Sequence, residues 1–485
     1  MPASGIRYVN ASGSDAGNLC TAPSLPCRSI QHAVDQAQPG EEVRIAGGTY
    51  SGVGVRNGIS QTVYISKSLA IRGGYSAANW AVPDTAANPT ILDAQRQGRV
   101  LYATGDIHIT LEGLRITGGD ATGLGGYTQA GWTAAWDAGG GVYVRFAAGE
   151  IRDCRVYSNT AGSGYSVGGG LSLWQTSLSL RDSVVSENAS GHFGGGLFLR
   201  EVTGSIRGDT VISNTSEYGG GLFAQSPDVH ITRNVIQGNV ATNNGGGIAM
   251  MWTTGTLESN SIVTNTANLR GGGLDLDRSP ITMVGNTIVG NVANAVLGGG
   301  MRIIQSDALL VNNVVAANVC NGTGAGIHVM NSSPRLLHTT FADNRGGDGS
   351  AAHVASQSGA FSRAVFTNTI LSGHTVGITV TQGNTVTLAS TLWHANASDW
   401  AGAGALGHTQ DYAGPPAFVN PAGGDYHIGA ASSAIDQGVD AGVTTDLDGH
   451  VRPWGLAPDL GADEYGSAAP AAYSIHLPII FRRRQ

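Results

Sequence analysis

The chain has 485 residues, of which 74 are glycine, 41% are hydrophobic and only 12% are charged. This composition excludes intrinsic disorder, which needs few apolar residues and a high charge. The net charge of −8 and the isoelectric point near 5.9 argue against a nucleic acid as the partner.

Residues 1–42 are expected to cap the start of the fold. Apolar residues recur at helical spacing over residues 29–38, after Ser29, a typical N-cap residue, and Pro39-Gly40 ends the pattern. A short amphipathic helix at this position would cover an open sheet edge. An extended, strand-like pattern follows from Val43.

Two cysteines, Cys20 and Cys27, lie just before this helix. In an oxidising compartment they would bridge a small loop. The alternative, a metal site, lacks the second pair of ligands that such a site needs. The first residues, Met1–Ser4, contain no apolar stretch of a secretory signal, so we expect that a leader peptide is not present in this chain.

Three consecutive glycines recur every 25 to 29 residues along the middle of the chain. An alternating apolar run such as Leu197-Phe198-Leu199 follows each triplet, and this period of two indicates strands. One repeat cannot bury its apolar face alone, whereas stacked repeats can. The pattern predicts a parallel β-helix of about 13 to 14 coils, with a rise of about 4.8 Å each. The triplets begin at Gly139, Gly168, Gly194, Gly219, Gly245, Gly271 and Gly298, and a degraded copy follows at Gly324.

A column of asparagines keeps the same spacing. Stacked in register, such side chains hydrogen-bond from coil to coil, as they do in cross-β ladders. A buried amide needs these partners. We therefore expect a structural ladder of Asn159, Asn188, Asn214, Asn239, Asn265, Asn291, Asn318 and Asn344.

The repeat resembles that of a group of bacterial surface adhesins, the polymorphic outer-membrane proteins. Their Gly-Gly-x-apolar motif alternates with Phe-x-x-Asn, which stands in full as Phe341-Ala342-Asp343-Asn344 here and as Val211-Ile212-Ser213-Asn214 in another copy. More broadly, the chain resembles pectin-lyase-like right-handed β-helices, which include enzymes and adhesins. The resemblance implies a right-handed, single-stranded β-helix and a secreted or cell-surface location.

Alternation along the strand after each triplet places every second side chain outward. Over residues 143–225 these outward positions are rich in aromatic and cationic side chains, and a long loop over 120–138 adds tryptophans beside them. Such a face suits an extracellular polysaccharide or a cell-surface glycan that lies along a groove. The candidate ligand-binding residues are Tyr143, Trp174, Phe198, Arg200, Phe223, Trp132 and Trp136.

Further along, the same face gathers Asp275, Asp277, Arg302 and His328. Asp275 and Asp277 lie two residues apart on one strand, and a separation of about 7 Å would suit the acid and the base of an inverting glycosidase. A surface ion pair explains the same residues. Three functions therefore remain open: non-catalytic glycan binding, a polysaccharide lyase or glycoside hydrolase, and a purely structural rod.

The glycine period ends before residues 415–465. The runs Asp446–Pro453 and Pro458–Tyr465 resemble the bacterial choice-of-anchor Q module, which implies a small closing module ahead of a surface anchor. Asp446 and Asp448 also form half of a calcium loop, so calcium is the one metal considered, and no other cofactor is expected.

The tail over residues 466–485 is too short in its apolar part to span a bilayer, which takes about 20 apolar residues. Its alternating positions over 473–481 could add a strand to a second copy, and head-to-tail contacts of this kind build filaments.

The sequence thus predicts an all-β chain with an N-terminal helical cap over 1–42, a right-handed parallel β-helix over 43–414, a C-terminal capping module over 415–465 and a tail over 466–485. The favoured function is that of an extracellular bacterial adhesin-like or structural surface protein, and the alternative is a polysaccharide-degrading enzyme.

Overall fold

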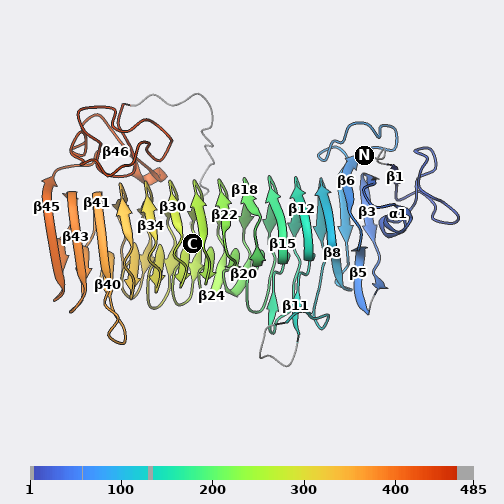
Figure 1. The fold of residues 1–485 in the computed structure, drawn as a ribbon, viewed down its shortest axis with the longest axis horizontal. Coiled ribbons are helices and arrows are strands. Elements are labelled where there is room, and N and C mark those ends of the chain that lie inside the picture. The colour runs from blue at the N-terminus through green and yellow to red at the C-terminus, as the bar shows by residue number, and fades with distance from the viewer. Residues whose placement is uncertain (1–4, 57, 129–134, 467–485) are drawn as a thin grey trace. The chain divides into compact units, whose positions relative to one another are not determined.

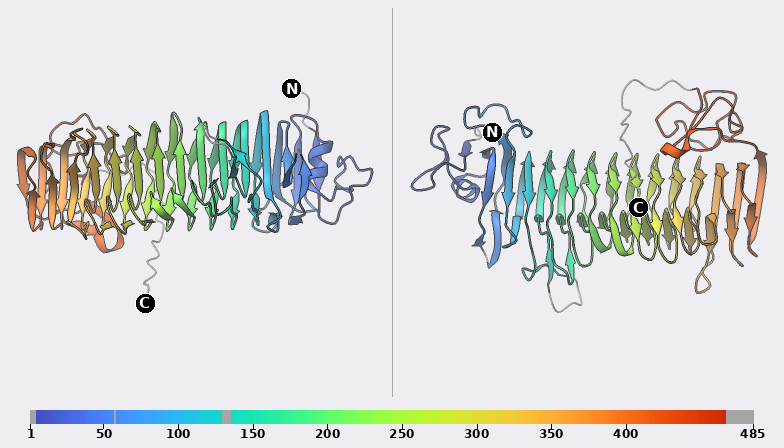
Figure 2. Two further views of the ribbon diagram at one scale, coloured as in Figure 1. Left: turned by 90° about the horizontal axis from the view of Figure 1, so that it is seen from below. Right: turned by 180° about the vertical axis from the view of Figure 1, so that it is seen from behind.

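The computed structural model describes residues 5–56, 58–128 and 135–466 (Figure 1). Across these residues the chain is an all-β parallel solenoid of about 14 turns with almost no helix, as the repeat predicts. Its backbone contacts divide into two units, Met1–Thr254 and Gly255–Gln485, which are described separately below. Figure 2 shows from two further sides how the strands of each unit stack as successive coils.

The first unit begins with the helix that the sequence predicts. Helix α1 (Ile30–Gln36) starts after Ser29, whose side chain accepts a hydrogen bond from the His32 backbone N–H. The helix buries Ile30, Ala33 and Val34, and it contacts β1, β2 and β5. Cys20 and Cys27 form a disulfide just before it. This region also contains the short strand β4 (Gly54–Arg56), which pairs antiparallel with β5.

The first unit has three strand faces and a group of outlying strands. The face after the triplets contains β5 (Ile59–Ile65), β8 (Arg99–Glu112), β12 (Val142–Arg152), β15 (Leu171–Arg181), β17 (Leu197–Val202), β21 (Leu222–Gln225) and β25 (Ile248–Met251). The second face contains β1 (Ile6–Val9), β2 (Glu42–Ala46), β6 (Leu69–Tyr75), β18 (Ser205–Arg207) and β22 (Val229–Thr232), together with the distal parts of β8, β12 and β15. The third contains β3 (Gly48–Ser51), β7 (Thr90–Asp93), β9 (Leu114–Thr117), β13 (Arg155–Tyr157), β16 (Val184–Ser186), β19 (Thr210–Ile212) and β23 (Val235–Gln237). The outlying strands are β10 (Gly126–Tyr127), β11 (Trp136–Ala138), β14 (Ser166–Val167), β20 (Thr215–Tyr218) and β24 (Val240–Asn244).

The second unit repeats this arrangement. Its first face contains β29 (Leu274–Asp277), β33 (Met301–Ile304), β37 (Ile327–Met330), β40 (Ser350–Ala355), β42 (Val376–Val380) and β44 (Ser398–Ala401). Its second face contains β26 (Gly255–Glu258), β30 (Thr282–Val284), β34 (Leu309–Val311), β38 (Arg335–Leu337), β41 (Arg363–Ser372), β43 (Thr385–His394) and β45 (Ala405–Ala413). Its third face contains β27 (Ser261–Val263), β31 (Thr287–Val289), β35 (Val314–Ala316) and β39 (Thr340–Ala342), and its outlying strands are β28 (Thr266–Ala267), β32 (Val292–Ala293) and β36 (Val319–Cys320).

The core of each unit is the inward side of these strands. The predicted inward residues of the first face are all fully buried: Leu197, Leu199, Leu222, Leu274, Leu276, Ile327 and Val329. This outcome confirms that these residues form the core.

The triplets are glycine because two neighbouring backbones meet there. The first glycine of a triplet has a positive φ, 63° at Gly194, which disfavours other residues. A Cβ on Gly195 would lie 2.3 Å from the Thr215 carbonyl oxygen and 2.6 Å from that of Gly220. A side chain at Gly195 would therefore force the stacked coils apart, and one at Gly194 would collide with the Leu197 carbonyl oxygen of its own coil.

The asparagine column hydrogen-bonds from coil to coil within each unit. In the first unit, Asn188 Nδ2 donates to Asn214 Oδ1 at 3.0 Å, and in the second unit Asn291 Nδ2 donates to Asn318 Oδ1 at 3.0 Å. A further ladder of small hydroxyls was not anticipated from the sequence. In it the backbone N–H of Ser306 donates to Ser332 Oγ at 3.0 Å.

The segment after the last coil returns along the side of the second unit. It contains β46 (Phe418–Asn420), the 3-10 helix η1 (Pro421–Gly423) and β47 (Asp425–Ile428), and β46 is labelled in Figure 1. Its apolar side chains Tyr426, Leu447 and Ala462 pack against valines and alanines of the third face. Asn368 Nδ2 donates to the Val439 carbonyl oxygen at 2.7 Å. The sequence placed this module as a cap, whereas these contacts are lateral.

Candidate functional site

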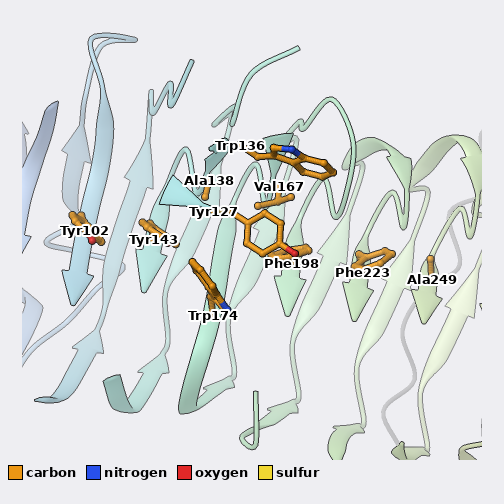
Figure 3. Packing of buried hydrophobic residues seen from close by; sticks show 10 residues of the cluster. All are labelled: Tyr102, Tyr127, Trp136, Ala138, Tyr143, Val167, Trp174, Phe198, Phe223 and Ala249. Carbon is orange, nitrogen blue, oxygen red and sulfur yellow. The ribbon is translucent and has the colours of Figure 1, made fainter. Parts of the chain in front are cut away.

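The aromatic side chains after the triplets in the first unit are aligned but covered. Tyr143, Phe198 and Phe223 follow one another in register along the first face, with Ser172 between the first two. They are buried because outlying side chains pack over them, as Figure 3 shows for Tyr127 and Trp136. We call the set Tyr102, Tyr127, Trp136, Tyr143, Trp174, Phe198 and Phe223 the aromatic cluster.

The expectation of an open aromatic groove at these positions therefore needs correction. Alternation identifies which side chains point away from the solenoid core, and Tyr143, Phe198 and Phe223 do so. It does not reveal that Phe193 and Tyr218 fold back over them. The predicted Trp132 lies outside the described residues.

A buried arginine holds the covering loop in place. Arg99 is fully buried, and its Nε donates to the Ala138 carbonyl oxygen at 2.6 Å while its Nη2 donates to that of Gly125. Its guanidinium lies 5.3 Å from the Tyr143 ring centre. Burial lowers the pKa of Arg99 to about 10. The sequence offered no signal for this role, since Arg99 lies outside the triplet repeats.

The next outward position of the first unit is partly accessible, although Trp174 itself is only 7% exposed. The register aligns Arg145, Trp174, Arg200 and Gln225 on successive coils, and Phe146, Gln175, Glu201 and Trp252 lie at the adjoining corner. Phe146 is 44% exposed and Trp252 is 52% exposed. We call this surface the ledge, and it comprises Arg145, Phe146, Trp174, Gln175, Arg200, Glu201, Gln225, Met251 and Trp252.

Cation–π contacts order the ledge. The Arg145 guanidinium lies 4.3 Å from the Phe146 ring centre and 4.1 Å from that of Trp174. Arg200 Nη1 donates to Gln225 Oε1 at 2.6 Å and also bonds the Tyr127 hydroxyl. Among the described residues, Trp174 Nε1 and Arg145 Nε have no hydrogen-bond partner. Of the predicted binding residues that the structure describes, Arg200 is therefore the one that is partly exposed at this surface, whereas Trp174 is buried beneath it.

In the second unit the position equivalent to the aromatic column is charged and buried. Asp275 and Arg302 are each 5% exposed and form a two-point ion pair, in which Arg302 Nη2 donates to Asp275 Oδ2 at 2.9 Å and Arg302 Nε bonds the other oxygen. Burial raises the pKa of Asp275, against the lowering effect of Arg302. Asp277 lies two residues on, half-buried, with Oδ1 3.2 Å from Arg278 Nη1.

His328 continues this column. It is buried, its ring stacks on that of His353 with centres 5.0 Å apart, and Thr323 Oγ1 lies 3.0 Å from its Nδ1. Burial, His353 and Arg302 lower the pKa of His328 to about 3. His353 in turn bonds Asp348 at 2.6 Å.

The structure brings the four predicted catalytic residues onto neighbouring strands, but not into the geometry of glycoside hydrolysis. Inversion needs two carboxylates on either side of a space for the sugar and water. Both oxygens of Asp275 are held by Arg302 instead. The expected open placement of Asp275, Arg302 and His328 is thus corrected to a buried one, and Thr323, from the segment before β37, contacts His328.

The acidic residues of the C-terminal segment form an internal network. Asp446 Oδ1 accepts the backbone N–H groups of Asp448 at 2.9 Å and His450 at 2.8 Å. Asp448 Oδ2 lies 2.7 Å from His427 Nε2, and the pKa of His427 is raised to about 10, first by this bond. Asp446, Asp448 and His450 each offer one ligand atom, and these atoms lie within 4.8 Å of one another, so calcium at this position stays a prediction.

Comparison with known proteins agrees with the fold. Residues 169–345 match the family model described as "Right handed beta helix region". The chain has the right-handed β-helix fold. This match covers the glycine repeats after the first triplet at Gly139 and does not extend to residues 415–465. A search of curated proteins found no match.

Solved structures with similar chains include polysaccharide lyases and glycoside hydrolases. A pectate lyase is 14% identical, with 95% of this chain and 96% of that chain covered and a TM-score of 0.37. DFA-IIIase from Arthrobacter chlorophenolicus A6, without its lid, is 11% identical, with 75% of this chain and 94% of that chain covered and a TM-score of 0.41. An alpha-1,3-glucanase from Streptomyces thermodiastaticus is 12% identical, with 79% of this chain and 65% of that chain covered and a TM-score of 0.31.

None of the helices in the described part of the chain has the length and apolar character needed to cross a membrane.

Proposed function

We propose that the protein is an extracellular, adhesin-like surface protein that binds an extended carbohydrate along the ledge and does not cleave it. The observation that carries this proposal is the stack of Phe146, Arg145 and Trp174. The rings lie 4.3 Å and 4.1 Å from the guanidinium, and Phe146 is open to solvent. Aromatic faces with a few placed polar groups are typical of ligand sites.

The ledge has the length for a chain-like ligand. Phe146 and Trp252 are separated by four coil steps, from β12 through β15, β17 and β21 to β25. At about 4.8 Å a step this separation is roughly 19 Å. The side chains between them, Gln175, Arg200 and Gln225, supply amide and guanidinium donors for sugar hydroxyls.

One observation supports binding over cleavage, and another supports an extracellular location. The candidate acid Asp275 is held by Arg302 in a buried ion pair, so it is not free to transfer a proton to a substrate. The disulfide between Cys20 and Cys27 is of the kind that persists in oxidising compartments.

The test measures the affinity of the full chain for soluble polysaccharides by affinity electrophoresis and calorimetry. The probes are polygalacturonate, alginate, xylan and a β-glucan. Phe146→Ala and Trp252→Ala should each weaken binding by about fivefold to tenfold, the loss of one ring contact of about 1 kcal/mol. The matched controls Phe361→Ala and Trp400→Ala remove rings that are 55% and 44% exposed in the second unit, and they should bind as the parent does.

Equal losses in the control variants, or no binding to any probe, would contradict the proposal. New reducing ends or unsaturated products released from a probe would instead establish the alternative, a polysaccharide lyase or glycoside hydrolase. In that case Asp277→Asn would show whether the predicted acidic residues take part.

A further inference from the structure

A cavity of about 800 Å³ lies beside α1 in the first unit, apart from the ledge. The start of the helix, the edge strand β3 and the hairpin of β4 and β5 surround it, together with the loop around Asp15. This volume falls within the roughly 300 to 1,000 Å³ typical of small-molecule sites.

The cavity is lined by an amide that the protein itself does not use. Gln61 is 2% exposed, and neither Nε2 nor Oε1 has a hydrogen-bond partner among the residues that the structure describes. Its neighbours on the same side of β5, Val63 and Ile65, fill the core. Buried amides in folded proteins are nearly always paired, so an unpaired one that lines a cavity points to a ligand.

Hydroxyls add to this polar lining. Those of Thr49 and Ser51 lie on the opposite side, on β3. The lining therefore offers an amide and two hydroxyls, groups that both donate and accept.

Two charged groups of the lining, Asp15 and Arg56, already have partners within the protein. Asp15 accepts hydrogen bonds from the Arg28 backbone N–H at 2.7 Å and from Ser29 Oγ at 2.8 Å. Arg56 forms an ion pair with Asp35 at 2.5 Å. The Asp15 carboxylate keeps its negative charge and would repel an anion, whereas a neutral ligand needs no opposite charge from the lining. Ile30, Tyr50 and Val53 supply apolar surface for the face of such a ligand.

We propose that this cavity binds a neutral mono- or disaccharide, with the Gln61 amide bonding two of its hydroxyls and Thr49 and Ser51 bonding others. This site goes beyond the function proposed for the ledge and does not depend on it. The sugar is either free or the end of a longer chain, because both present the same hydroxyls.

The test is calorimetry on the full chain with cellobiose, maltose and lactose, and with digalacturonate and inorganic phosphate as anionic probes. At least one neutral disaccharide should bind, and Gln61→Leu should weaken it by about tenfold or more because the buried hydrogen bonds are lost. Gln97→Leu, an exposed glutamine outside the cavity, should leave the affinity unchanged. A fluorescently labelled polymer of the same sugar shows whether chain ends are bound as well.

Stability provides a second readout. Without sugar, Gln61→Leu should melt at the same temperature as the parent or higher, since leucine replaces an unpaired amide. Thr49→Ala, at an exposed position, should fold normally and bind several-fold more weakly.

Four outcomes would overturn the inference: no binding of any neutral sugar, stronger binding of the anions, unchanged affinity in Gln61→Leu, or a clear fall in its melting temperature. The ledge is tested with polymers and the variants Phe146→Ala and Trp252→Ala, so failure of one proposal is distinguishable from failure of the other.

Discussion

The same position of the repeat has opposite chemistry in the two units. The first outward residue after the triplet is Tyr143, Phe198 or Phe223 in the first unit, and Asp275, Arg302 or His328 in the second. All six are buried. The solenoid backbone thus fixes the direction of this position, the segments that pack over it bury it, and the side chain decides whether it holds a ring stack or an ion pair.

This difference has energetic consequences. The rings of the first unit gain from burial of apolar area and from stacking, as between Phe198 and Phe223 with centres 5.8 Å apart. The ion pair of the second unit must overcome the cost of removing two charges from water. We therefore expect the first unit to tolerate changes of ring type, and the second to depend on both partners of the pair.

The largest effect is expected from breaking the ion pair. Arg302→Met leaves Asp275 buried without a partner and should lower the free energy of unfolding by about 3–5 kcal/mol. Urea denaturation followed by hydrogen exchange of the second unit measures this change.

The double variant Asp275→Leu, Arg302→Met is the control, because it removes both charges and should come within about 1 kcal/mol of the parent. A single variant as stable as the double would show that the pair is not buried as described.

The asparagine ladder should matter equally in both units. Asn188→Leu and Asn291→Leu each break hydrogen bonds to the preceding and following coils and leave buried N–H and carbonyl groups unpaired. Each substitution should lower the free energy of unfolding by about 2–4 kcal/mol, because each buried group left unpaired costs about 1–3 kcal/mol. Thermal unfolding of the two variants is the measurement, and a neutral result for either one would refute the ladder in that unit.

Acid should destabilise the second unit through His328. Its pKa is lowered from 6.5 to about 3 by burial, His353 and Arg302, so its contribution is complete above pH 6.5 and is lost as the pH falls. At pH 5.5, which is one unit below the pKa of the unfolded state, the free energy of unfolding should be about 1.4 kcal/mol lower.

His328→Phe, which imitates the first unit, should remove this part of the acid sensitivity. Denaturation curves at pH 7.0 and pH 5.5 give the comparison, and an unchanged pH dependence in the variant would contradict it. His353 and Asp348, which face His328, stay in place in both proteins.

A smaller effect of opposite sign is expected in the C-terminal segment. Hydrogen bonding to Asp448 raises the pKa of His427 to about 10, so its contribution is present below pH 6.5 and is lost as the pH rises toward 10. Because His427 and Asp448 are partly exposed, the loss should stay below about 1 kcal/mol. Melting temperatures of the parent and His427→Gln between pH 6 and 10 test it, and parallel curves would count against the pair.

The sequence predicted the fold because one period organises backbone and core together. The glycine triplets, the inward leucines and the ladder asparagines all repeat at the same spacing, and each has one structural meaning in stacked coils. The position of α1 followed from Ser29 and Pro39 for similarly local reasons.

The site was less predictable because it depends on what covers each strand. Alternation gave the direction of Phe198 and Asp275, but their burial depends on segments some residues away that pack over them. The small Ser ladder around Ser306 had the same spacing as the asparagines and could have been found from it. No sequence pattern around Gln61 indicated a role for it. Its amide stands out only in the folded structure, where it has no hydrogen-bond partner among the described residues.

The most direct test of the proposed function is a hydrogen-exchange footprint of the full chain with a bound polysaccharide from the affinity screen. The account predicts slower amide exchange at the ends of β12, β15, β17, β21 and β25 next to the ledge, no protection around Asp277 in the second unit, and no cleavage products. Protection centred on β29 and β33, or turnover of the polysaccharide during the measurement, would contradict it.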